Sequence, residues 1–134
     1  MYSATAGVGS SLQRLERFPD YQNNQLLILA GLEMTIAYSL LEARWKIWHS
    51  IFWKRSHSAT KFAVSKKLEG IAFDANTSII NAGKFLNEYY DLHGISDRDR
   101  DAWIEIIRSL TSANRWLNEQ FGINCTAKQL KIDL

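Results

Sequence analysis

The sequence of 134 residues is long enough for one domain with a hydrophobic core of its own, without a metal ion or a disulfide. Apolar residues make up 46% and aromatic residues 12% of the chain, which excludes a disordered protein. One proline and seven glycines provide too few turn residues for an all-β fold, and the formal net charge is only +2.

The predicted elements are helices throughout. After a flexible end at about residues 1–9, a short helix is expected over residues 10–18. Phe18-Pro19 then marks the start of a long helix. Polar residues recur there at spacings of three and four, as on one solvated stripe of an α-helix: Thr35, Ser39, Glu42, Lys46 and His49. The other faces are apolar, which is typical of a central helix, and we expect it to span about residues 21–55.

Two further long helices follow. Apolar residues spaced by three or four predict a helix over about residues 59–93, with Gly70 as the point where it could break. Ser96 is expected to cap a last helix over about residues 97–121, with Asp97 and Asp99 in its first turn. Short connections require neighbouring helices to be antiparallel. The sequence therefore predicts an all-α antiparallel bundle, one domain over residues 1–134 with a second flexible end at about 123–134.

The apolar run from Leu26 to Leu41 resembles a membrane span. Its 16 residues fall short of the roughly 20 that a spanning helix needs, and Glu33 and Thr35 lie near its middle. We expect a buried core helix instead. The basic, tryptophan-rich run that follows would also suit an interfacial anchor, so a protein lying on a membrane surface is a third alternative.

Motifs of catalysis or metal binding are missing from the sequence. His49, His57 and His93 have no second histidine or carboxylate at metal-ligand spacing on one helix face. There is no glycine-rich phosphate loop, and Cys125 has no base nearby in the sequence. We expect a protein that is not an enzyme and holds no cofactor or metal. A single cysteine and the lack of a signal peptide in residues 1–11 indicate a cytoplasmic protein.

The cations are segregated within the chain. Between Glu42 and Glu69 there is no acidic residue, yet seven of the 16 lysines and arginines lie there, while nine cations and 14 acids share the remaining sequence. Segregated positive charge indicates a polyanionic partner. We predict a nucleic-acid site, RNA or DNA with weak sequence specificity, formed by a basic hairpin tip: Arg44, Lys46, Trp53, Lys54, Arg55, Lys61, Lys66 and Lys67.

The tryptophans of this segment are assigned by their helical phase. Trp53 continues the polar stripe of the first long helix, so we expect it to point outward, where it can stack on a base or anchor a protein. Trp45 and Trp48 flank apolar positions and are expected in the core. Two alternatives stay open: a module that docks on an acidic protein surface, such as an inhibitor, and a charged end that only keeps the protein in solution.

Several short sequences carry a family resemblance: Phe18-Pro19, Leu40-Leu41-Glu42-Ala43, the turn from Tyr90 to Ser96, Ile106-Ile107, Leu110 and Trp116-Leu117. Over about residues 15–121 this layout resembles the four-helix-bundle family of the ribosomal-RNA intervening-sequence proteins and the accessory variability determinant of diversity-generating retroelements. Arg108 and Arg115 match its basic residues in the final helix. The resemblance implies a homo-oligomeric bundle, pentameric in the accessory protein, that binds nucleic acid and a reverse transcriptase.

Overall fold

A computed structural model describes residues 3–122 of the chain. Within this range the secondary structure is helical, in chain order: α1 (Ala4–Glu16), the 3-10 turn η1 (Tyr21–Asn23), α2 (Gln25–His49), α3 (Ile51–Lys54), α4 (Ser58–His93) and α5 (Arg100–Phe121). The all-α class predicted from the sequence is confirmed.

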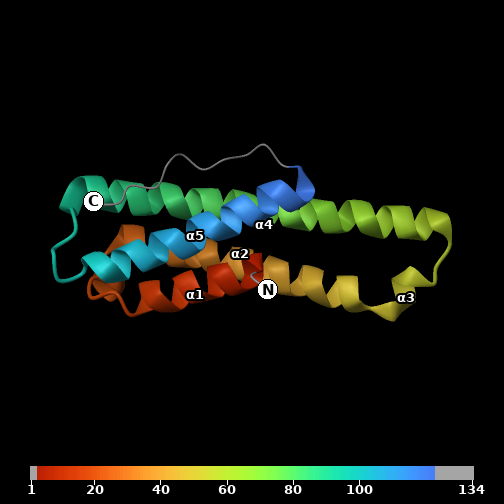
Figure 1. Cartoon of the computed structure of the whole chain (residues 1–134), viewed down its shortest axis with the longest axis horizontal. Coiled ribbons are helices and arrows are strands. Elements are labelled where there is room, and N and C mark those ends of the chain that lie inside the picture. Colours follow the sequence, from red (N-terminus) through yellow and green to blue (C-terminus); the bar gives the residue numbers. More distant parts are fainter. Residues whose placement is uncertain (1–2, 123–134) are drawn as a thin grey trace.

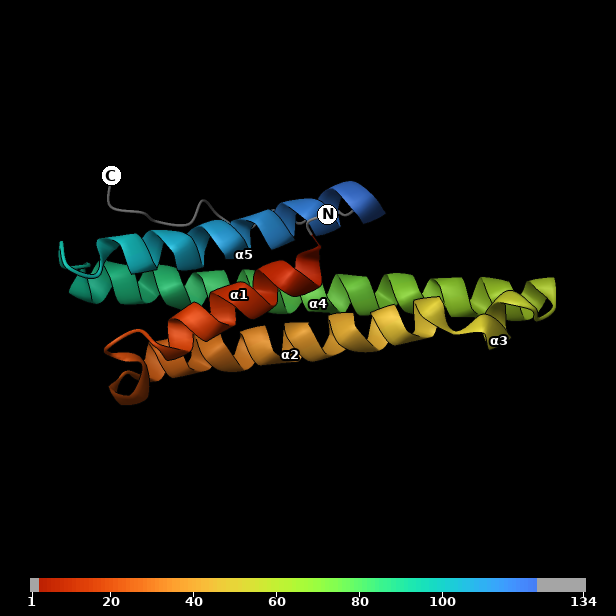
Figure 2. The same cartoon turned by 60° about the horizontal axis from the view of Figure 1, so that its bottom comes forward.

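The four long helices form an antiparallel bundle in which each runs opposite to the one before (Figures 1 and 2). Helix α1 packs against α2 and α5, and α4 packs against the same two helices. The core between them contains fully buried large side chains from all four helices: Leu15, Leu27, Met34, Ile79, Leu86, Trp103, Ile106, Ile107, Leu110 and Leu117. Burial of these side chains, about 1.5–3 kcal/mol each, is what holds the bundle together.

Helix α1 begins at Ala4, six residues before the predicted start, and residues 4–9 are therefore not a flexible end. Ser3 caps it, because its Oγ accepts a hydrogen bond from the Ala6 N–H at 3.2 Å. The buried side of this first part is made of small residues, and a Cβ at Gly9 would lie 3.0 Å from the Tyr38 ring. Small residues allow α1 to approach α2 closely, but they give a weak periodic signal in the sequence.

The first long helix predicted over residues 21–55 is wrong at both ends. Pro19 leads into the turn η1, and α2 starts only after Asn24, whose Oδ1 accepts from the Leu26 N–H at 2.9 Å. Its C-terminal end lies at His49 because Ser50 adopts an extended conformation, with ψ at 128°. The next four residues form the separate turn α3. This break changes the direction of every side chain between Ile51 and Arg55.

The prediction of an unbroken second helix is confirmed, since α4 passes through Gly70 without interruption. It ends at Gly94, whose φ of 65° suits a glycine. The last helix starts three residues later than predicted, and Ser96 is not its cap. The Ser96 hydroxyl instead bonds Asp99 Oδ2 at 3.0 Å, which holds residues 97–99 in a turn before the helix. The predicted flexible end at 123–134 lies outside the described residues.

Polar side chains fix the position of α5 inside the bundle. Asn114 Nδ2 donates to Asn76 Oδ1 at 2.8 Å, and Asn76 Nδ2 donates to Asn118 Oδ1 at 3.1 Å. On the other side of α5, the buried Ser11 hydroxyl donates to the Ile106 carbonyl at 2.8 Å. Buried polar groups need their partners, so these bonds select one register of α5 against α4 and α1.

Candidate functional site

Helices α2 and α4 extend past the ends of α1 and α5, and their far parts project from the bundle as a two-helix hairpin closed by α3 (Figures 1 and 2). We call residues 43–67 the arm. Every residue of the arm is described, and none of its side chains is buried; Leu68 is the first buried residue of α4. The arm coincides with the acid-free segment of the sequence.

Most cations of the arm are accessible. The side chains of six are exposed: Lys46, Lys54, Arg55, Lys61, Lys66 and Lys67. Within residues 3–122 none of them forms an ion pair, and the pair between Arg108 and Glu105 lies on α5 at 3.4 Å. Asp97, Asp99 and Asp101 precede or open α5 at the opposite end of the bundle (Figure 1). No carboxylate of the described chain therefore forms an ion pair with these six cations, and Glu42 and Glu69 only border the arm at its base.

The cations surround the arm rather than line one side of it. Lys66 and Lys67 are neighbours in α4, so they point about 100° apart on the helix, and both are exposed. Lys54, Arg55 and Lys61 flank the turn at the tip, as the sequence predicted. A partner on one side can contact only part of the set at once.

Arg44 differs from the other predicted cations. Its guanidinium lies over the Phe121 ring at 4.5 Å and the Trp48 ring at 5.8 Å, and its Nε is buried with no hydrogen-bond partner among the described residues. Desolvation lowers the pKa of Arg44, although arginine stays charged at neutral pH. Arg44 joins the base of the arm to the end of α5 and is not a freely accessible phosphate ligand.

The tryptophan assignment from the sequence is wrong. Trp53 is half-buried with its Nε1 enclosed, and it packs on Trp48 with ring centroids 5.7 Å apart. Trp45 and Trp48, expected in the core, are 58% and 45% exposed. The break at Ser50 turns Trp53 inward, while α1 and α5 end too early to cover the other two. Trp45 and Trp48, rather than Trp53, are therefore the exposed tryptophans of the arm.

Large apolar side chains on the arm were missed by sequence reasoning. Phe52 is 83% exposed, Phe62 is 66% exposed and Ile51 is 53% exposed. They alternate with cations: Lys54 Nζ lies 5.4 Å from the Trp48 ring centroid, and Lys66 Nζ lies 5.4 Å from that of Phe62. An accessible apolar surface of this kind indicates a binding site.

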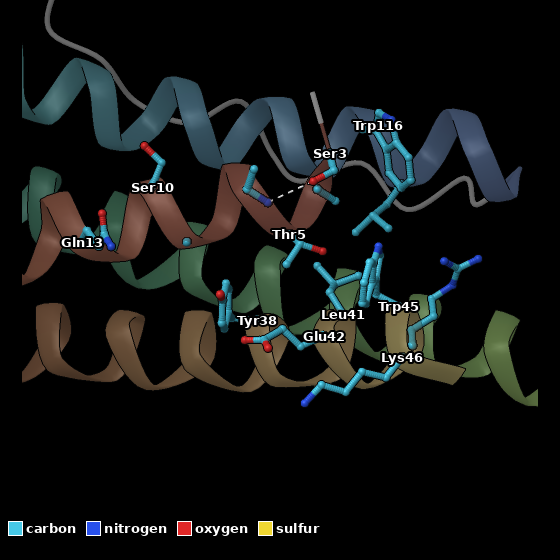
Figure 3. A pocket seen from close by; sticks show the side chains of 15 residues that line it. Ser3, Thr5, Ser10, Gln13, Tyr38, Leu41, Glu42, Trp45, Lys46 and Trp116 are labelled. Atoms are coloured by element: carbon cyan, nitrogen blue, oxygen red, sulfur yellow. Dashed lines mark hydrogen bonds between the residues drawn. The ribbon is translucent and has the colours of Figure 1, made fainter. Parts of the chain in front are cut away.

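A groove of about 670 Å³ lies where the arm leaves the bundle (Figure 3). Its walls are the first turns of α1, the outer side of α2 and the C-terminal turns of α5. Figure 3 shows Tyr38, Glu42 and Trp45 on successive turns of α2, and Trp116 above them on α5. Arg44 and Lys46 also line the groove, and the Lys46 side chain runs back along α2 towards Glu42 (Figure 3). The groove could not be predicted from the sequence, because its walls meet only through tertiary packing.

Other kinds of site have less support. Among residues 3–122, no three His, Cys, Asp or Glu side chains gather as metal ligands, and Cys125 lies outside that range. Helix α2 is long and apolar enough by composition to cross a membrane. In the bundle it nevertheless buries one side against its neighbours, including Leu27, Met34 and Leu41. Comparison with protein-family models, curated proteins and solved structures found no match, so the family resemblance stays a prediction.

Proposed function

We propose that this protein is a non-catalytic nucleic-acid-binding bundle that uses the arm as its binding surface. The observation that carries the proposal is the combination of six exposed cations without a carboxylate partner in the described chain and exposed aromatic rings between them. Phosphates are bound by lysine and arginine, and unstacked bases are bound by aromatic faces.

The shape of the arm sets what kind of binding to expect. The two helices of the arm pack on each other, and its cations surround it, so the arm has no fixed row of side chains that would read base edges. Contacts to phosphates carry no sequence information. Binding should therefore depend weakly on sequence and strongly on salt, with the log–log slope steeper by about 0.7–0.9 for each phosphate neutralised.

Fluorescence anisotropy with labelled nucleic acids of unrelated sequence, titrated at several salt concentrations, tests the proposal. Lys54→Gln, Arg55→Gln and Lys61→Gln together should flatten the salt slope by about two to three units. The matched control removes three exposed cations of the bundle: Lys84→Gln, Arg98→Gln and Arg115→Gln. The control should keep the slope. Equal effects of the two triple variants would assign binding to net charge and overturn the proposal.

A second candidate function is docking of a protein, including another copy of this chain. The observation in its favour is an exposed apolar stripe on the outer side of α2, where Leu32 is 54%, Ile36 is 49% and Ile47 is 37% exposed. Residues at these spacings lie on one helix face. Gel filtration with light scattering, with and without nucleic acid, separates self-association through this stripe from a monomer that binds through the arm.

A further inference from the structure

The groove at the base of the arm has the features of a site for a flat, aromatic ligand. Its volume of about 670 Å³ lies within the range of small-molecule sites, about 300–1,000 Å³. The rings of Tyr38, Trp45 and Trp116 line it, and hydroxyl groups of Ser3 and Thr5 at the first turn of α1 provide polar contacts. These are the groups that recognise an unstacked nucleobase by stacking and by hydrogen bonds to its edges.

The groove is continuous with the arm through a chain of ring contacts. Trp116 meets Phe121 with centroids 6.3 Å apart, and Phe121 lies under the Arg44 guanidinium. Arg44 also contacts Trp48, which in turn lies beside Lys54. A strand bound along the arm can therefore follow these rings from the arm to the groove, where Glu42 and the exposed Glu119 are the nearest acids in sequence.

Glu42 determines which part of a nucleotide can enter. Its carboxylate lines the groove beside Tyr38 and raises the pKa of the Tyr38 hydroxyl. A phosphate placed beside this carboxylate would be repelled, whereas the exposed cations of the arm, Lys46 among them, attract one. A nucleotide that places its base in the groove and its phosphates towards the arm avoids the repulsion by Glu42 and gains the attraction of the cations.

We propose that the groove holds one unpaired base of a single-stranded nucleic acid, stacked on Trp45, with the adjoining phosphates on Lys46 and the arm. The inference rests on the proposed function and deepens it by naming single strands as the preferred ligand. Trp45 is suited to this role because it is 58% exposed and its ring contacts His49, with ring centroids 4.2 Å apart. A base in a duplex is already paired and stacked, so it cannot enter without leaving the helix.

The test compares a labelled single strand of about 12 nucleotides, within the site sizes of single-strand-binding proteins, with the blunt duplex of the same sequence. Anisotropy and quenching of tryptophan fluorescence are followed for the unchanged protein and for Trp45→Ala, Trp45→Phe and Phe73→Ala. Phe73 is the matched control, a 48% exposed aromatic residue of α4 that lies outside the arm and does not line the groove. Circular dichroism establishes that each variant is folded.

We expect the single strand to bind more tightly than the duplex. Trp45→Ala should weaken single-strand binding by about 5- to 150-fold, corresponding to the about 1–3 kcal/mol that stacking of one base contributes, and should leave duplex binding unchanged. Trp45→Phe should retain most of the preference for the single strand, and Phe73→Ala should retain all of it.

Two results would overturn the inference and leave the proposed function standing: equal binding of strand and duplex, or an effect of Phe73→Ala as large as that of Trp45→Ala. Binding of neither nucleic acid would remove the proposed function itself.

Discussion

The asparagine contacts between α4 and α5 allow a quantitative prediction for Asn114→Ala. Asn114 and Asn76 are 5% and 1% exposed, and the bond from Asn114 Nδ2 to Asn76 Oδ1 measures 2.8 Å. Alanine removes that bond and takes a donor from a buried acceptor, which together cost about 2–3 kcal/mol. With an unfolding entropy of about 2.1 cal/mol/K per residue over the roughly 120 residues of the bundle, Tm should fall by about 8–12 °C.

Thermal unfolding followed by circular dichroism, together with urea titration, measures this loss. Thr77→Ala is the control, because Thr77 is exposed on α4 and its hydroxyl donates to the Phe73 carbonyl of the same helix at 3.1 Å, so we expect a change within about 0.5 kcal/mol. Asn114 lies two residues before Trp116, so the same bond also supports one wall of the groove. A change in stability below about 0.5 kcal/mol for Asn114→Ala would refute the structural role given to these side chains.

Two further predictions concern pH and local stability. Burial, together with the hydrogen bond from the Tyr89 hydroxyl to Asp20 Oδ2 at 2.8 Å, raises the pKa of Tyr89 above its ordinary value of 10.0. Since the pKa of Tyr89 is higher in the folded state than in the unfolded state, its contribution to folding stability is complete below about pH 10 and is lost as the pH rises further. Tyr89→Phe should therefore reduce the fall of the urea midpoint at alkaline pH. An equally steep fall in the variant would contradict the role given to the Tyr89 hydroxyl. Because the arm has no buried side chain, its amides should exchange with deuterium much faster than those of α4 between Ala72 and Leu86. Equal protection of the two segments would show that the arm is stabilised by something other than its own contacts.

The helices that could be predicted from the sequence are those whose apolar residues are large and regularly spaced. Helix α4 follows this pattern over its whole length, and its predicted bounds are within one residue of the observed ones. Helix α1 buries Ala4, Gly7 and Val8, which carry little of the pattern, so its first two turns were missed. The extended Ser50 could not be foreseen, because serine is tolerated inside helices and no proline or glycine marks the break.

The location of the cations in the candidate site could be predicted from the sequence, whereas the exposure of its aromatic side chains could not. Segregation of lysine and arginine is a property of composition, and it located the arm. The direction of Trp53 depended on an unbroken helix through Ser50, and the exposure of Trp45 depended on where α1 and α5 end. Both are consequences of tertiary structure, and so is the groove between three helices.

The most direct test of nucleic-acid binding by the arm is a two-dimensional NMR titration of the labelled protein with an oligonucleotide. We expect amide signals of residues 43–67 and of the groove walls to shift, while those of the turn between α4 and α5 at the other end of the bundle stay in place. Shifts that cluster at that far turn, or a spectrum that does not change at all, would contradict the account.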